Sequence, residues 1–242
     1  MCGRYAYTLP PEMMVELFKT LNQLIYPPRY NIAPTQPVVA IWQAEGRREA
    51  HLARWGFMPG WVKDPKDFPL IINARAEGIT DKPAFRSAIK NTRCIVPASG
   101  YYEWMIGPDK KKLPYYITLR GNAPKAFAGL YSIWMGPNGE EVDTVTICTT
   151  ASGEDTAHLH DRMPVILAGD DVDAWLDTGS LNGLQAQSLL VPLPAGAMAY
   201  YPVSTEANSN RSEGPQLIEP ARETVAEPEP RKQVGSGQLD LF

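Results

Sequence analysis

A cysteine at the second position can do chemistry that no internal cysteine can. An initiator methionine that precedes a small side chain is normally removed, and Cys2 would then carry a free α-amine and a thiol on one residue. Their pKa values, about 7.7–8.0 for an α-amine and about 8.5 for a thiol, leave both groups reactive near neutral pH. An aldehyde would form a Schiff base with the amine, and the thiol could then close a five-membered thiazolidine ring. The alternative is an exposed second residue with no chemical role.

Two further segments combine a titratable side chain with neighbours that suit proton transfer. Glu103 stands between aromatic residues in the run Gly-Tyr-Tyr-Glu-Trp at 100–104, and a half-buried carboxylate has a raised pKa that suits general acid–base catalysis. His160 is followed by Asp161 and Arg162, so this histidine could act as an acid or base beside an anion site. Taken alone, Glu103 is equally well explained as a surface residue of an edge strand, and His160 as a structural or solvated histidine.

A third group of residues suits a sugar-phosphate ligand. Asn73 and Arg75 are two apart in a strand-like segment, so their side chains face the same side. They could address a sugar hydroxyl and a phosphate, or form a hydrogen bond and a salt bridge within the protein. Trp61 follows Gly60 in a Gly/Pro-rich loop, where an exposed ring could stack on a base of a single strand. Trp55 and Phe57 are better explained as core residues.

The overall charge of the 242-residue chain hides a strong asymmetry. The net charge is −4, from 23 Lys+Arg and 27 Asp+Glu. Residues 1–130 contain 18 of the basic and 10 of the acidic residues, so the first half is +8 and the second half −12. Such a division is typical of a chain with a polyanionic partner or an acidic tail.

Cysteine usage and hydropathy favour a reduced, cytoplasmic protein. Cys2, Cys94 and Cys148 are an odd number without metal-ligand spacing, so we expect neither a disulfide nor a metal. We expect Cys94 and Cys148 on strands that face the core, and we expect no cofactor. The sequence has no apolar run near the ~18–20 residues of a membrane span and no secretory signal pattern.

Short strands separated by prolines dominate the predicted secondary structure. The 23 prolines disfavour a helical bundle, and apolar alternation predicts a hairpin formed by residues 38–42 and 51–57. Further strands are expected at 94–96, 101–104, 115–119, 127–134, 142–149, 165–167 and 198–203. Helices are expected at 10–22, 83–91, 152–158 and 170–178. The pattern predicts an α+β fold with predominantly antiparallel, strongly bent or barrel-like β-sheets and a few short helices; parallel winding is disfavoured because few helices lie between strands.

The composition changes at about Arg222. Residues 222–237 are polar and contain Pro and Gly, so we expect a folded domain over 2–221 and a disordered tail over 222–242. The last five residues are Gln238, Leu239, Asp240, Leu241 and Phe242. They resemble the short peptide with which bacterial replication proteins bind the sliding clamp, and a flexible tether would present the apolar anchors to a groove. The alternative is an apolar terminus without a partner.

Six motifs occur in an order that resembles one protein family. They are Met-Cys-Gly-Arg-Tyr at 1–5, Arg-Tyr-Asn-Ile-Ala-Pro at 29–34, Trp-Gly with Pro-Gly-Trp at 55–61, Ile-Asn-Ala-Arg-Ala-Glu at 72–77, Gly-Tyr-Tyr-Glu-Trp at 100–104 and His-Asp-Arg-Met-Pro at 160–164. Over about residues 2–220 the chain is similar to the SRAP family, the SOS-response-associated peptidase-like, abasic-site-processing proteins. Each motif alone is weak, whereas six in order with cysteine at position two are specific.

The resemblance implies a sensor that crosslinks itself to abasic sites in single-stranded DNA and shields them from strand cleavage during replication. It implies that Cys2 is the nucleophile after removal of Met1. It further implies that Asn73 positions the amine and the opened sugar, that Glu103 relays protons, and that His160 promotes opening of the sugar ring. A weak lyase activity and autocatalytic removal of Met1 belong to the same resemblance.

The resemblance also implies the DNA contacts and the partners. Arg4, Arg75 and Arg162 would bind phosphates, and Trp61 would stack on a base or block the complementary strand. The expected partners are single-stranded DNA with abasic sites and, through the tail, the sliding clamp. We expect a monomer that works in the cytoplasm, at the nucleoid and the replication fork.

Two other functions are compatible with the same residues. One is a cysteine peptidase in which Cys2 attacks peptide carbonyls and His160 is the base. The other is a non-catalytic module that binds single-stranded DNA. Crosslinking is favoured because the adjacent α-amine explains why the thiol stands at the N-terminus.

Overall fold

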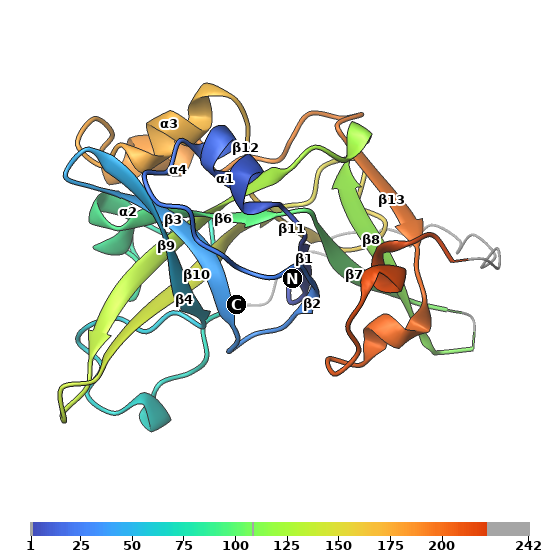
Figure 1. The fold of residues 1–242 in the computed structure, drawn as a ribbon, viewed down its shortest axis with the longest axis horizontal. Coiled ribbons are helices and arrows are strands. Elements are labelled where there is room, and N and C mark those ends of the chain that lie inside the picture. The colour runs from blue at the N-terminus through green and yellow to red at the C-terminus, as the bar shows by residue number, and fades with distance from the viewer. Residues whose placement is uncertain (1, 108, 222–242) are drawn as a thin grey trace, which may run out of the picture.

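The computed structural model describes residues 2–107 and 109–221, which form two β-sheets with short helices at their edges (Figure 1). The five-stranded sheet contains β1 (Tyr5–Tyr7), β2 (Arg29–Ile32), β7 (Gly100–Ile106), β8 (Lys112–Leu119) and β13 (Met198–Pro202), in the order β13-β8-β7-β1-β2. The eight-stranded sheet contains β3 (Pro37–Ala44), β4 (Arg47–Trp55), β5 (Asn73–Arg75), β6 (Arg93–Ala98), β9 (Lys125–Met135), β10 (Glu141–Ala151), β11 (Arg162–Pro164) and β12 (Ile166–Leu167).

The eight-stranded sheet closes on itself. The predicted hairpin is present as β3 and β4, and β3 continues through β6 to β9. β9 pairs with β10, and β10 returns to β4 at Thr144↔Arg54 and Val145↔Trp55. The pairings β4-β3-β6-β9-β10 therefore form a closed circuit, which leaves these strands without a free edge. The predicted α+β, barrel-like and predominantly antiparallel fold is confirmed.

Two pairings of this predominantly antiparallel sheet are parallel, and neither was predicted from the sequence. β10 runs parallel to β4 and to β5, which pairs with it at Ile147↔Asn73 and Thr149↔Arg75. Parallel strands need a long connection, and the expectation considered only crossovers made by helices. Here the strands β6 to β9 make the connection, because closure of the barrel returns β10 beside β4.

Four short helices cover the edges of the sheets: α1 (Pro11–Phe18), α2 (Ala88–Asn91), α3 (Asp170–Leu176) and α4 (Gly183–Ser188). α1 ends before the predicted residue 22 because Lys19 adopts a left-handed backbone with φ of 56°. α3 lies where a helix was predicted. α4 was not predicted, although Asn182 and Gln185 form a capping box at its start.

The helix predicted at 152–158 is wrong, because residues 154–159 form consecutive turns and residues 152–153 are irregular. The side chain of Asp155 does not cap a helix. It accepts hydrogen bonds from the backbone N–H groups of Gly196 (2.9 Å) and Met198 (3.0 Å) at the start of β13. We refer to residues 152–161 as the acid–base loop, since it ends at His160 and Asp161.

The core holds the residues that were assigned to it and one residue that was not. Trp55, Phe57, Cys94 and Cys148 are buried, and both of these cysteines are free thiols. Arg93 is also buried, with 1% of its surface exposed.

Arg93 joins two helix ends. Its Nη1 donates to the carbonyl of Ile89 in α2 (2.9 Å), while Nε and Nη2 donate to the carbonyls of Trp175 (2.5 Å) and Asp177 (2.7 Å) at the end of α3. The C-terminus of a helix carries unpaired carbonyls and partial negative charge. The buried guanidinium therefore satisfies carbonyl groups that both helices leave open.

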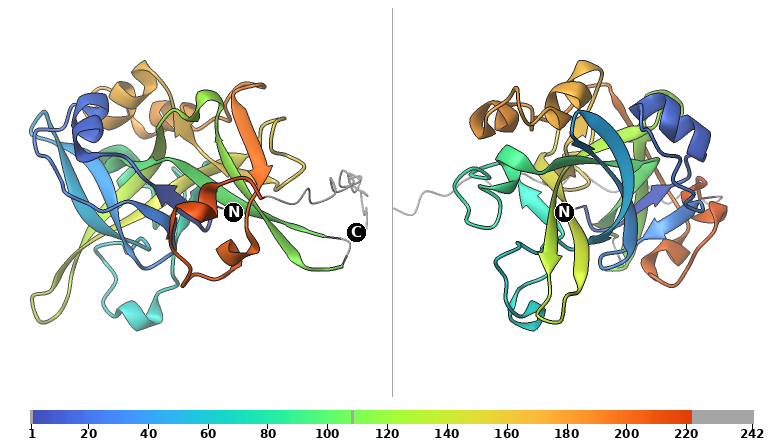
Figure 2. Two further views of the ribbon diagram at one scale, coloured as in Figure 1. Left: turned by 45° about the vertical axis from the view of Figure 1, so that its right-hand side comes forward. Right: turned by 60° about the vertical axis from the view of Figure 1, so that its left-hand side comes forward.

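The last part of the described chain wraps against the first. After β13, residues 203–221 (red in Figure 2) run beside β1 and β2. Asn31 in β2 donates hydrogen bonds from Nδ2 to the carbonyls of Ser209 (2.9 Å) and Ser212 (2.8 Å) in this segment. We call residues 203–221 the C-terminal strap.

Some predictions fall on residues that the structure does not describe. The tail 222–242 and its last five residues 238–242 lie outside the described residues, so the domain boundary and the clamp interaction stay predictions. In the two described ranges, no helix combines the length and the apolar character needed to cross a membrane.

Candidate active site

The five-stranded sheet holds the N-terminal strand β1 in its interior, between the edge strand β2 and the central strand β7. β1 pairs with β7 at Tyr5↔Tyr101, and the N–H of Tyr102 donates to the carbonyl of Arg4 (3.0 Å). This register brings the start of the chain alongside Glu103. Cys2 is completely buried, with 0% of its surface exposed. The cysteine is therefore fixed in the fold and is not the exposed second residue of the alternative interpretation; its chemical role stays a prediction.

The Cys2 thiol, the Tyr101 hydroxyl and the Glu103 carboxyl influence one another. Burial raises the pKa of the Cys2 thiol, and the nearby Glu103 carboxylate raises this pKa further. Burial also raises the pKa of Tyr101, with Cys2 and Glu103 adding to the increase. These mutual effects place the three side chains close together.

Glu103 is a buried carboxyl on a central strand. It is 4% exposed, and β7 is flanked by β1 and β8, so Glu103 is not a surface residue of an edge strand. Burial raises the pKa of Glu103 to about 7, and the Asp161 carboxylate contributes to the increase. The effect of Asp161 places the acid–base loop near Glu103. A carboxyl with this pKa can both accept and donate a proton near neutral pH.

His160 stands at the end of the acid–base loop with two alternative partners for one nitrogen. Its Nδ1 accepts a hydrogen bond from the N–H of Arg162 (2.9 Å) when the ring is neutral. When the ring is protonated, the same Nδ1 can donate to Asp161 Oδ1, which is 2.8 Å away. The His160 side chain is 27% exposed. It can therefore exchange a proton with a ligand and has a stabilised partner in either state.

Asn73 presents an open acceptor at the start of β5. Its Nδ2 donates to the carbonyl of Ile72 (3.0 Å), while its Oδ1 is buried and accepts no hydrogen bond from any described residue. The carbonyl of Ile72 also accepts from Trp55 Nε1 (2.9 Å), and the Trp55 ring packs edge-on against Tyr5 of β1 at 5.4 Å. Asn73 is thus connected through Ile72 and Trp55 to β1, the strand that follows Cys2. A buried oxygen without a donor favours a ligand that donates a hydrogen bond to it.

Arg75 and Arg162 converge on one residue of β10. Arg75 is exposed and pairs in register with Thr149, while Nη2 of Arg162 donates to the carbonyl of Thr149 (2.6 Å). Arg162 also forms a two-pronged ion pair with Glu77, at 2.7 and 2.9 Å. This pair lowers the pKa of Glu77. The two guanidinium groups form a cationic area in which Arg75 is open and Arg162 is held in orientation by Glu77.

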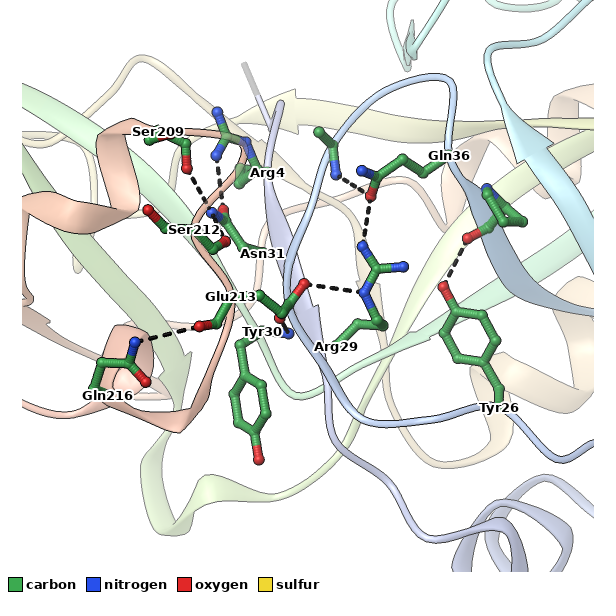
Figure 3. A network of polar contacts seen from close by, with 12 residues as sticks. Arg4, Tyr26, Arg29, Tyr30, Asn31, Gln36, Ser209, Ser212, Glu213 and Gln216 are labelled. Atoms are coloured by element: carbon green, nitrogen blue, oxygen red, sulfur yellow. Dashed lines mark hydrogen bonds and ion pairs between the residues drawn. The ribbon is translucent and has the colours of Figure 1, made fainter.

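Arg4 points toward Asn31 and the C-terminal strap (Figure 3). Its Nη1 donates to Asn31 Oδ1 (2.7 Å) and to the carbonyl of Ala207 in the C-terminal strap (3.3 Å). Its guanidinium lies 5.5 Å from the centre of the Trp104 ring. Trp104 is next to Glu103 on β7 and faces the opposite side, because side chains alternate along a strand. Arg4 is therefore not brought together with Glu103, and its role as a phosphate ligand stays a prediction.

Trp61 lies apart from these groups, in the loop between β4 and β5. Its side chain is 61% exposed, and its ring meets Phe68 edge-on at 5.6 Å. The next residue, Val62, is buried and its carbonyl accepts from Trp134 Nε1 (2.7 Å). An exposed ring on an anchored loop is suited to stacking on a base.

The fold and this site define a member of a known family. The chain belongs to the SOS response associated peptidase (SRAP) family, whose family model matches residues 1–210. It is 39% identical to the Abasic site processing protein YoqW of Bacillus subtilis over 223 residues, which cover 90% of this chain and 99% of YoqW. It is 28% identical to the Abasic site processing protein YedK of Escherichia coli, covering 91% of this chain and all of YedK. A crystal structure of a protein from Bacteroides thetaiotaomicron has a TM-score of 0.81 at 28% identity, over 91% of this chain and all of that protein.

Two residues that orient the predicted arginines had no role in the sequence-based prediction. Glu77 orients Arg162, and Asn31 orients Arg4. Glu77 lies in the turn that follows β5, and its partner Arg162 is 85 residues later, so no local pattern indicates the pair. The pairing of Asn31 with Arg4 joins strands β1 and β2 with the strap, and no local pattern indicates it.

Replacing Glu103 with glutamine should make the stability of the protein less dependent on pH. The folded protein binds a proton at Glu103 with a pKa of about 7, above the ordinary value of 4.5 for a glutamate. The folded state therefore holds more protons between pH 4.5 and 7, and the parent loses stability as the pH rises through this window. The loss amounts to roughly 3 kcal/mol once the carboxyl is ionised. Thermal unfolding is measured at pH 4.5, 6 and 8. The stability of Glu103→Gln relative to the parent should increase with pH. A difference in stability that is constant with pH contradicts the assignment of this pKa to Glu103.

Proposed function

We propose that this protein processes abasic sites in single-stranded DNA by forming a covalent thiazolidine crosslink through Cys2, after removal of Met1. The names of its relatives support the substrate. The observation that carries the chemistry is the buried Cys2 beside Glu103, whose pKa is about 7. An abasic sugar in its open form is an aldehyde, which is the group that condenses with an aminothiol. The product would shield the site from strand cleavage during replication.

The first step is formation of a Schiff base. His160 would protonate the ring oxygen of the sugar, the bond from this oxygen to C1 would break, and the C1 hydroxyl would lose its proton to water to give the aldehyde. The α-amine of Cys2 then adds to the aldehyde carbon, the carbonyl becomes a hydroxyl, and this hydroxyl leaves as water. Glu103 would accept a proton from the amine and return one to the leaving hydroxyl, a cycle that its pKa of about 7 permits. The open Oδ1 of Asn73 would accept a hydrogen bond from the amine or the sugar.

The second step is closure of the ring. The Cys2 sulfur bonds to the imine carbon, the electron pair of the C=N bond moves to nitrogen, and the thiol proton is transferred to nitrogen, with Glu103 as the relay. Aldehyde and aminothiol thus give thiazolidine and one water. Closure removes the iminium group, which would otherwise acidify the adjacent sugar C–H and promote β-elimination. The DNA strand therefore stays intact.

A peptidase that uses Cys2 against other proteins is less consistent with the site. Such an enzyme needs a thiolate as nucleophile, and burial raises the pKa of this thiol. The addition of a thiol to an iminium carbon does not need a free thiolate, because the proton can pass to nitrogen in the same step. The burial of the Cys2 thiol therefore supports crosslinking more than peptide cleavage.

Intact-mass spectrometry separates the three candidate functions. The full chain is first checked for loss of Met1, then incubated with an abasic single-stranded oligonucleotide and, separately, with a mixture of peptides. The expected result is a mass increase equal to the oligonucleotide minus one water. Cleaved peptides without a DNA adduct would favour the peptidase, and neither product from a chain that has lost Met1 would favour a binding module.

Arg75 should contribute to DNA affinity through charge alone. Its side chain is exposed and lies beside Arg162 at Thr149. Arg75→Gln removes one cation, so the slope of log K against log salt should become shallower by about 0.7 for single-stranded DNA. Fluorescence anisotropy from 50 to 300 mM salt measures this slope, with the exposed Arg47→Gln on β4 as the control. An unchanged slope for Arg75→Gln would remove this residue from the DNA interface.

A further inference from the structure

The face of the five-stranded sheet that carries Glu103 continues to β13 at the edge. Residues opposite one another in antiparallel strands share a face of the sheet. Tyr101 is opposite Ile117, and Ile117 is opposite Tyr200. Glu103 is two residues from Tyr101 on the same strand and shares this face. Tyr200 therefore lies on the face of the candidate active site, two strands away from Glu103.

The neighbour of Tyr200 confirms this orientation. Tyr201 faces the other side, where its hydroxyl donates to the carbonyl of Ile218 in the C-terminal strap (2.8 Å) and its ring contacts Tyr116 at 5.8 Å. Tyr200 thus points away from the strap. Its ring contacts Tyr115, the residue opposite Glu103, at 6.3 Å.

Tyr200 is exposed, and its ring contacts two other rings of the protein. Its side chain is 42% exposed, whereas Tyr115 is only 5% exposed. The ring of His158 lies 4.7 Å from the Tyr200 ring, at an angle of 57°. His158 belongs to the acid–base loop and is two residues before His160. The position of Tyr200 is therefore coupled to the loop that supplies the candidate acid.

Strand spacing gives the distance between this ring and the candidate chemistry. Neighbouring strands lie about 4.8 Å apart, so Tyr200 is roughly 10–12 Å from Glu103 across two strands and along the pleat. A nucleotide beside the reacting sugar could reach this distance in an extended strand. Figure 1 shows β13 on one side of the N-terminus and the loop 56–72, which carries Trp61, on the other.

We propose that Tyr200, supported by His158 and Tyr115, is a stacking platform for the base of a nucleotide that flanks the abasic site, on the opposite side from Trp61. This inference rests on the proposed function. An abasic nucleotide has no base to stack, so the flanking bases must hold the strand in place. Aromatic rings bind any base by its face, which suits recognition of a lesion without regard to sequence. With one ring on each side, the missing base would be centred over Cys2.

The test is a cycle of protein and oligonucleotide changes. Single strands with a central tetrahydrofuran residue, an abasic analogue that cannot open to an aldehyde, are compared with strands in which the 5′ or the 3′ neighbour is also tetrahydrofuran. Affinities are measured by fluorescence anisotropy for the parent, Tyr200→Ala, Tyr200→Phe and Trp61→Ala. Ile25→Ala, at an exposed apolar side chain before β2, is the control.

Tyr200→Ala should bind the strand with both neighbours about tenfold more weakly, while Tyr200→Phe should bind like the parent. On one of the two strands that lack a neighbouring base, Tyr200→Ala should bind as tightly as the parent. On the other of these strands, Trp61→Ala should bind as tightly as the parent. Equal affinity of Tyr200→Ala and the parent, or a loss that is the same on all three strands, would overturn the platform. Formation of the adduct by the parent on a true abasic strand reports the proposed function separately, so that the two can fail independently.

Discussion

A Cys2→Ser protein should form no heat-stable adduct with abasic single-stranded DNA. Serine keeps the α-amine, so the Schiff base can still form, but a hydroxyl in place of the thiol cannot close the thiazolidine. The imine will then either hydrolyse or promote β-elimination next to Asn73 and Glu103. We expect the adduct yield after heating to fall at least a hundredfold, and strand cleavage to increase. Denaturing gels of the heated reaction, with and without borohydride to trap the imine, measure both effects.

The other two cysteines provide the matched control. Cys94 and Cys148 are buried free thiols in the core of the barrel, away from the chain terminus. Cys94→Ala and Cys148→Ala should retain the adduct in the folded fraction of the protein. Equal heat-stable yields from Cys2→Ser and the parent would falsify the crosslinking mechanism.

Arg93→Met should produce the largest loss of stability among single substitutions outside the site. The guanidinium donates to carbonyls of Ile89, Trp175 and Asp177, and its removal leaves these acceptors buried without donors. An unpaired buried acceptor costs about 1–3 kcal/mol, and the three together should cost roughly 3–6 kcal/mol. For a domain of this size, that corresponds to a decrease in the melting temperature of about 10 °C or more.

Urea unfolding followed by tryptophan fluorescence measures this loss directly, because Trp175 packs against Arg93, with 5.7 Å from the guanidinium carbon to the ring centre. Arg86→Met is the control, since Arg86 is exposed and just precedes α2. The free energy of unfolding of Arg86→Met should stay within about 0.5 kcal/mol of that of the parent. Equal midpoints for Arg93→Met and Arg86→Met would show that water or neighbouring groups satisfy the carbonyls.

The local parts of the fold could be predicted from the sequence. Alternating apolar residues identified the hairpin of β3 and β4, and the acidic segment with Trp175 identified α3. Pairings between distant strands could not be predicted in this way. Tyr5 is opposite Tyr101, and β10 is parallel to β4, because closure of the barrel decides these registers rather than any local pattern.

In the candidate site, too, local features could be predicted from the sequence and contacts between distant segments could not. The types and contexts of Cys2, Glu103 and Asn73 made them candidates for chemistry, because each side chain carries a reactive or hydrogen-bonding group whose properties its neighbours can change. The direction of Arg4 could not be predicted, because it depends on which face of β1 meets the strap. The helix expected at 152–158 was wrong for a related reason: Asp155 binds the start of β13, which is distant in the sequence.

The position of β1 inside the sheet has a consequence for the order in which the protein is made. β1 pairs with β7, almost a hundred residues later in the chain, and the Arg4 side chain just before β1 contacts the strap at Ala207. During synthesis Cys2 therefore lacks Glu103 and the acid–base loop until most of the domain has been translated. Under the proposed mechanism, its amine and thiol would be unassisted nucleophiles towards the aldehydes of the cell until then. Delayed assembly of the site would keep the protein from reacting with other aldehydes before it can select DNA.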